Sequence, residues 1–370
     1  MRTWSRVLLW TAFLLLAGTG NAIAQVEAEP DSIKTRLIVG ARAHYGFVLI
    51  HSYALDPVRH SFPWGAEMDI GKQFVGKRAW DFCNCYPRAG AALTFWDYGS
   101  EILGYGATAM WYVEPVFLTR YRLNLSIRLG SGLSYQTHPY DSVTNPNNLA
   151  YSLRINVPVA VGLALNFRLN PHWSLRLAGN FNHVSNGGLA LPNKGINYPT
   201  VSLGADYAPQ GIDFQQRAKN MDKSPPKPRL RFYAGTLGTL KRASGADTRQ
   251  NRVWGIWSQG VYHVGRWSGL SLGLEWVNDG ARKVKMQREG IPGRHERGGV
   301  LVGHQFLLGR VIFSQQLGIY FFDQFQLNDP VYQRYGLGLH VTKRLFAGFS
   351  LKTHRHVADL LDLRLAWGIW

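Results

Sequence analysis

The residues with the clearest chemical potential are a histidine and a serine two positions apart, His183 and Ser185, in the sequence HVSNGG at residues 183–188. In a β-strand, residues i and i+2 point to the same face, so these two side chains are expected to lie together. That face also carries Trp173, Leu175, Leu177 and Phe181, whereas Ser174, Arg176, Asn180 and Asn182 occupy the other face. A base and a nucleophile on an apolar face suit a substrate that is itself apolar.

This pair is the core of an ester-cleaving site. A serine hydroxyl attacks when a base within hydrogen-bond reach takes its proton, and a neutral His183 can do this and later protonate the leaving alcohol. A third group must orient the imidazole. Asn197, at the start of the next expected strand, can accept that hydrogen bond, although a neutral amide stabilises the imidazolium less than a carboxylate does. We expect Asn186, or the backbone N–H groups of the glycines after it, to supply an oxyanion hole, and Asn193 to position the loop.

A simpler interpretation needs no chemistry. A His-x-Ser pair on a strand is often an interfacial histidine beside a solvated serine, and the glycines and the sequence NKG at residues 193–195 can serve only as loop and turn residues. The joint spacing of the histidine, the serine, two asparagines and the Gly/Pro elements favours the catalytic interpretation.

Apolar and polar residues alternate over long stretches, most clearly in residues 122–136 and 151–167. Period-two alternation indicates strands, and these runs exceed the five or six residues of a typical globular strand. A transmembrane strand needs about 9–11 residues. A soluble β-sandwich also alternates, but with shorter strands and a larger polar face. Trp, Tyr and Phe make up 13% of the chain, which fits aromatic girdles at membrane interfaces. The pattern predicts an all-β, transmembrane antiparallel β-barrel.

The pattern contains about sixteen candidate strands, and a count of twelve to sixteen is consistent with it. Short turns such as residues 168–171 would lie on the periplasmic side, and long loops such as residues 137–149 and 186–196 would lie outside. The candidate site is then at the outer-leaflet end of its strand. A polar, proline-rich link at residues 209–228 could separate two eight-stranded barrels. Because the second half does not repeat the first, we expect one continuous barrel.

The beginning of the chain predicts export. A charged start, a short apolar run and the small residues before Gln25 are typical of a signal peptide at residues 1–24. The barrel would then occupy residues 25–370, with strands at 35–208 and 229–370. No later segment reads as a membrane-spanning helix.

The formal net charge is +18. We expect part of this excess to line the lumen, on Arg42, Arg128, Arg154 and Arg176, rather than to form a nucleic-acid surface. Cys83 and Cys85 are separated by one residue, so a bridge between them would be strained and is not expected. Further ligands for a metal are lacking, and we assign no metal.

The motif HVSNGGL at 183–189, with PNKGI at 192–196, resembles the lipid A 3-O-deacylase family, whose longer members are acyloxyacyl hydrolases. The resemblance is tight over the motif and looser over residues 35–208. It implies an integral outer-membrane enzyme that binds lipopolysaccharide in the outer leaflet and removes an ester-linked acyl chain from lipid A, with a Ser-His-acid triad. The chain departs from the family at Asn197, where the family carries a glutamate, so the third member of the triad is a neutral amide here.

Two alternatives remain open. The outer-membrane phospholipase A enzymes use a histidine, a serine two residues later and an asparagine, which is similar to His183, Ser185 and Asn197, but they lack the Pro-Asn-x-Gly-Ile element. That reading would raise the question of calcium, whereas the deacylase reading implies no cofactor. The third reading is a non-enzymatic barrel, either a pore or an adhesin. The oligomeric state is open.

A basic cluster lies in an expected outer loop at residues 278–298, on Arg282, Lys283, Lys285 and Arg288. Such a cluster can be a solvated loop, or it can bind the phosphates of lipopolysaccharide, which arginine contacts in bidentate fashion. We take these residues as candidates for substrate binding.

Overall fold

The computed structural model describes residues 34–244, 247, 249–324, 329–355 and 357–370, so the expected signal peptide lies outside the described residues. Within this part of the chain the fold is all-β, with sixteen antiparallel strands and three short helices, and the predicted fold class and strand count are confirmed. None of the described helices is long and apolar enough to cross a bilayer.

The first eight strands are β1 (Thr35–Gly46), β2 (Trp64–Phe74), β3 (Tyr86–Asp97), β4 (Tyr105–Phe117), β5 (Leu123–Gln136), β6 (Ile155–Arg168), β7 (Trp173–Ser185) and β8 (Ile196–Tyr207). The second eight are β9 (Leu230–Arg242), β10 (Gln250–Gly265), β11 (Ser268–Asp279), β12 (Glu296–Leu308), β13 (Val311–Phe322), β14 (Val331–His340), β15 (Leu345–His354) and β16 (Val357–Ile369). The helices are η1 (Tyr53–Val58), α2 (Lys77–Cys83) and α3 (Gly280–Arg288).

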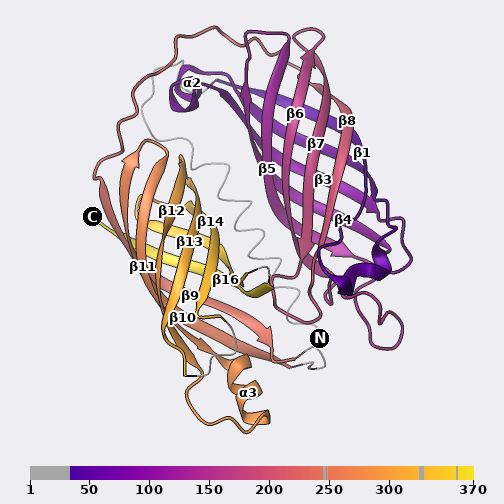
Figure 1. Cartoon of the computed structure of the whole chain (residues 1–370). Helices are drawn as coiled ribbons and strands as arrows, with labels where there is room; N and C mark the ends of the chain where they lie inside the picture. The colour runs from indigo at the N-terminus through magenta and orange to yellow at the C-terminus, as the bar shows by residue number, and fades with distance from the viewer. Residues whose placement is uncertain (1–33, 245–246, 248, 325–328, 356) are drawn as a thin grey trace.

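The chain closes twice, into a first barrel of β1–β8 and a second barrel of β9–β16 (Figure 1). β8 pairs with β1, and β16 pairs with β9. The prediction of one continuous barrel is therefore wrong, and residues 209–228 connect two closed barrels. Eight tilted strands enclose an interior that side chains just fill, so each half can close without resembling the other in sequence.

The alternation of each strand separates an apolar exterior from a polar lumen. On β7 the exterior residues Leu175, Leu177 and Phe181 are exposed, whereas Arg176 and Asn182 are buried inside, as predicted. Arg42 and Arg128 are also buried in the lumen. Arg154 is not, because β6 begins one residue later, at Ile155, and the Arg154 guanidinium is exposed beside the Tyr135 hydroxyl.

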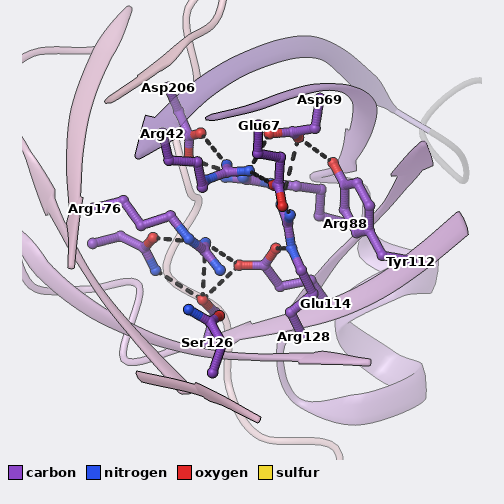
Figure 2. Close-up of polar contacts among 12 residues, drawn as sticks. Arg42, Glu67, Asp69, Arg88, Tyr112, Glu114, Ser126, Arg128, Arg176 and Asp206 are labelled. Atoms are coloured by element: carbon purple, nitrogen blue, oxygen red, sulfur yellow. Dashed lines mark hydrogen bonds and ion pairs between the residues drawn. The ribbon is translucent and has the colours of Figure 1, made fainter. Parts of the chain in front are cut away.

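Paired charges fill the lumen of the first barrel (Figure 2). The arginines are Arg42, Arg88, Arg128 and Arg176, and the carboxylates are Glu67, Asp69, Glu114 and Asp206. Arg128, for example, lies 2.8 Å from a carboxylate oxygen of Glu67 and 2.9 Å from one of Glu114. Each of these eight side chains is at most 7% exposed. The four arginines are thus balanced by four carboxylates, and this lumen holds no basic excess, contrary to expectation.

The two ends of the first barrel differ in their connections. Residues 118–122 and 169–172 are short turns at one end, whereas residues 137–154 and 186–195 are long connections at the other. Cys83 and Cys85 lie at the short-turn end and form a disulfide, contrary to the expectation of no bridge. The candidate site lies at the long-loop end, which is the outer end in outer-membrane barrels.

Candidate active site

His183 and Ser185 lie at the C-terminal end of β7, beside the first residues of β8. The register pairs His183 directly with Asn197. Val184, which lies between His183 and Ser185, and Ile196, which precedes Asn197, point into the barrel and are completely buried. They belong to an apolar cluster that closes this end of the lumen, with Val48, Leu55, Val58, Trp96, Tyr98, Leu103, Ala150, Tyr151 and Tyr198. Burial of Val184 and Ile196 therefore holds His183, Ser185 and Asn197 on the outer face.

The three predicted side chains form a hydrogen-bonded row. The His183 Nε2 atom lies 3.0 Å from the Ser185 Oγ atom, and the His183 Nδ1 atom lies 2.7 Å from the Asn197 Oδ1 atom. Ser185 is buried and His183 is partly buried. Serine, imidazole and an oriented acceptor in this sequence form the nucleophile–base–orienter arrangement of hydrolytic sites.

A fourth residue, His51, extends this row. It follows β1, and Leu49, two residues before it, forms a β-bridge with Asn197. The Asn197 Nδ2 atom lies 3.1 Å from the His51 Nδ1 atom, and the His51 Nε2 atom lies 3.0 Å from the Lys194 carbonyl oxygen. Sequence reasoning missed His51 because it lies 146 residues from Asn197, and no local spacing connects the two.

These contacts determine where the protons are. A carbonyl oxygen only accepts, so His51 Nε2 must donate to Lys194 and His51 Nδ1 must accept from the Asn197 amide nitrogen. The Asn197 oxygen then faces His183 and accepts its Nδ1–H. The remaining ring nitrogen of His183, Nε2, is left to accept the Ser185 proton, which is the tautomer that a general base needs.

The loop after Ser185 is held by the two predicted asparagines in different ways. The Asn193 Oδ1 atom accepts the Asn186 backbone N–H at 2.8 Å. The Asn193 Nδ2 atom is buried and has no hydrogen-bond partner among the described residues. A buried amide donor without a partner is costly, so its presence next to the residue that follows Ser185 points to a ligand atom that accepts its hydrogen bond.

Asn186 shapes the loop instead of facing a substrate. Its Nδ2 atom donates to the Ala190 carbonyl oxygen at 2.8 Å and lies 3.3 Å from the Ser152 Oγ atom, and its Oδ1 atom accepts the Gly188 N–H at 3.1 Å. Because its amide hydrogens are occupied, the geometry does not favour the expectation that Asn186 supplies the oxyanion hole.

Gly195 lies against His183 and Ser185. Its φ is +69°, and a Cβ atom there would lie 2.6 Å from the His183 Cε1 atom and 3.2 Å from the Ser185 Cβ atom. Only glycine permits both this backbone conformation and this approach. The PNKGI element is therefore part of the site.

The predicted basic cluster is not part of this site. It lies on α3 of the second barrel, and three of its members are paired there: Arg282 with Asp323, Arg288 with Asp247, and Lys285 with Glu289. Hydrogen bonds from Arg288 lower the pKa of Asp247 to about 2, so this pair stays charged at neutral pH. Lys283 is exposed. The structure does not bring the cluster together with the serine.

In the described part of the chain, no group of three or more His, Cys, Asp or Glu side chains is arranged to hold a metal ion.

Two family models match the chain, and they divide it as the structure does. Residues 65–206 match the model described as lipid A 3-O-deacylase (PagL), and residues 230–369 match the model described as acyloxyacyl hydrolase, C-terminal domain. The first match spans most of the first barrel, and the second spans the second barrel. Together they cover most of the chain. No curated protein matches the sequence.

Solved structures give distant likenesses. The crystal structure of the outer membrane enzyme PagL is 14% identical, with a TM-score of 0.34, covering 45% of this chain and 97% of that chain. Neisserial surface protein A is 11% identical, with a TM-score of 0.32, covering 47% of this chain and 98% of that chain. A porin mutant from Rh. blastica is 10% identical, with a TM-score of 0.23, covering 91% of this chain and 100% of that chain.

Proposed function

Because the chain belongs to the lipid A 3-O-deacylase family of outer-membrane enzymes, we propose that it is a serine esterase that removes an ester-linked acyl chain from lipid A. Family membership places the chain in the outer membrane as an integral protein, in keeping with its apolar exterior. The observation that carries the proposal is the row from Ser185 through His183 to Asn197, beside the unpaired amide of Asn193.

The reaction begins with attack by Ser185 on the ester carbonyl. As the bond from Oγ to the carbonyl carbon forms, His183 Nε2 takes the hydroxyl proton, and Asn197 holds the resulting imidazolium through its Nδ1–H. The carbonyl oxygen becomes an oxyanion, and the Asn193 amide is the donor that stabilises it. The Asn186 backbone N–H, bonded to the Asn193 oxygen, aims that amide.

Collapse of this intermediate breaks the ester bond. His183 gives its proton to the leaving sugar hydroxyl, and an acyl group remains on Ser185. Water then attacks the acyl carbon while His183 takes a proton from the water. The bond from the acyl carbon to the Ser185 Oγ atom breaks, His183 returns the proton to that oxygen, and a free fatty acid leaves. No cofactor takes part in either half of this cycle.

The surroundings suit a substrate with acyl chains. Below Ser185, the same face of β7 carries Phe181, Leu177, Leu175 and Trp173, all exposed on the barrel exterior. An acyl chain of an outer-leaflet lipid can lie along this face while its ester reaches the serine. Since the face is part of the bilayer surface, the substrate does not need to leave the membrane.

A phospholipase A activity is the second candidate, and one observation favours it: the third member of the row is an asparagine, Asn197, as in that family. The PNKGI element and its Gly195 contact with His183 favour the deacylase. The pore alternative is disfavoured because paired charges occupy the lumen of the first barrel (Figure 2).

Mass spectrometry of lipids from cells that express the wild type or Ser185→Ala separates these candidates. The proposal expects lipid A lighter by one acyl chain in wild-type cells alone. New lysophospholipid with intact lipid A would establish the phospholipase instead. No Ser185-dependent change in either pool would overturn both enzymatic assignments.

A further inference from the structure

The loop that follows Ser185 (residues 186–195, the esterase loop) contacts the second barrel. Gly187 and Gly188 both have positive φ, +66° and +82°. A Cβ atom on Gly187 would lie 2.7 Å from the Leu361 Cβ atom, so this glycine packs directly on β16. A Cβ atom on Gly188 would lie 2.9 Å from the backbone oxygens of Ala358 and Asp359. Two consecutive residues of the esterase loop thus contact the first residues of β16.

The next residue of the loop contacts the neighbouring strand. The Leu189 carbonyl oxygen accepts the backbone N–H of Arg242, the last residue of β9, at 3.2 Å. β9 and β16 are hydrogen-bonded neighbours that close the second barrel. The loop therefore contacts both β9 and β16, the two strands whose pairing closes the second barrel.

Ion pairs link β9 and β16 at this end of the second barrel. Asp359 of β16 accepts from Lys241 of β9 at 2.7 Å and from Arg297 at 3.0 Å. Arg297 also lies 3.1 Å from Asp279. Lys241 directly precedes Arg242, and Asp359 is itself one of the three residues of β16 that contact the loop. The residues that touch the loop are thus tied to a charged network inside the second barrel.

The contact is local and is not a general packing of barrel exteriors. Farther along the same face of β16, Leu363 is 68% exposed, and on β7 Leu177 is 48% exposed. At the short-turn end the second barrel contacts α2, where Trp267 donates its indole N–H to the Phe82 carbonyl oxygen at 2.7 Å. The barrels therefore meet at their ends, and at the outer end the meeting point is the esterase loop.

We propose that the second barrel positions the esterase site of the first, with Leu361 at the centre of the contact. This inference rests on the proposed function. A shift of Gly187 displaces the backbone of Asn186, to which it is bonded. The Asn186 N–H orients Asn193, which is the proposed donor to the oxyanion. Loss of the support misaligns a donor that acts in the transition state, so it lowers kcat and leaves KM nearly unchanged. Leu361 is a positioning residue and does not touch the substrate.

The test compares Leu361→Ala with Leu363→Ala in the full-length protein. Leu363 is the matched control, because it lies two residues later on the same face of the same strand. We expect Leu361→Ala to lower kcat for acyl release from lipid A by about tenfold with KM within about twofold, and Leu363→Ala to behave as the wild type. Leu361→Met, which fills the same space, should restore kcat.

Hydrogen–deuterium exchange supplies a readout that does not depend on the substrate. Leu361→Ala should accelerate exchange in residues 186–195, and Leu363→Ala should not. Unchanged exchange in Leu361→Ala, or equal kcat in the two alanine variants, overturns the inference. A loss confined to KM also overturns it, since it would make Leu361 part of a substrate subsite. A wild type without activity on lipid A, with faster exchange in Leu361→Ala, overturns the proposed function but preserves the contact.

Discussion

The Asn193 Nδ2 atom, which has no hydrogen-bond partner among the described residues, is the basis of a specific prediction about catalysis. Asn193→Asp keeps the oxygen that accepts the Asn186 N–H but replaces the buried Nδ2 donor with a carboxylate oxygen. Removal of one oxyanion-hole donor typically costs about 10²–10³-fold in kcat, or about 2.7–4 kcal/mol. Because the oxyanion exists only in the transition state and intermediate, KM should change little. Asn193→Ala should lose at least as much, since it also leaves the Asn186 N–H without its acceptor.

The assay is steady-state release of fatty acid from lipid A by purified protein, with kcat and KM determined separately. Asn147→Asp is the control, because Asn147 is an exposed asparagine of another loop at the same end of the barrel. A kcat of Asn193→Asp within about threefold of the wild type would contradict a donor role for Asn193. A loss confined to KM would also contradict it, because the amide would then bind the ground-state substrate.

Three further predictions follow from the same geometry. His51→Phe removes the acceptor that orients Asn197 and should lower kcat about tenfold, because the lost hydrogen bond contributes about 1.4 kcal/mol. His60→Phe in the same loop should have no effect. Chelation of divalent cations should leave lipid A deacylation unchanged, and a strict calcium requirement would argue for the phospholipase alternative. Arg128→Met leaves Glu67 and Glu114 buried with one partner fewer and should lower the free energy of unfolding in detergent by about 3–5 kcal/mol, whereas the exposed Arg154→Met should cost less than about 1 kcal/mol.

The strands and the core of the site were predictable because both depend on short-range patterns. Period-two alternation identifies which side of β7 carries Ser185, and adjacent antiparallel strands bring Asn197 opposite His183 through one loop. His51 was not predictable, because its position follows from a bridge between the segment after β1 and β8. The donor role proposed for Asn193 depends on which of its amide atoms contacts the Asn186 N–H, and no sequence pattern contains that information.

The division into two barrels was missed for a similar reason. Closure depends on whether β8 finds β1 or continues to β9, and the alternation of the strands is the same in either case. Three of the four arginines predicted for the lumen, Arg42, Arg128 and Arg176, lie there, and Arg154 does not. Their charge balance depends on carboxylates from other strands, such as Glu67 and Glu114. The sequence alone predicts that the basic residues of α3 are free to bind a substrate. Arg282 and Arg288 are instead paired with carboxylates from distant segments, Asp323 and Asp247.

Covalent labelling shows most directly whether Ser185, activated by His183, is the nucleophile. Purified protein is treated with a lipophilic, serine-directed alkyl fluorophosphonate, the adduct is located by peptide mass spectrometry, and residual lipid A deacylation is measured in the same sample. We predict one phosphonyl group on Ser185, activity lost in proportion to labelling, and no labelling in His183→Ala. Full labelling of Ser185 with deacylation intact, or inactivation with Ser185 unmodified, would contradict the account.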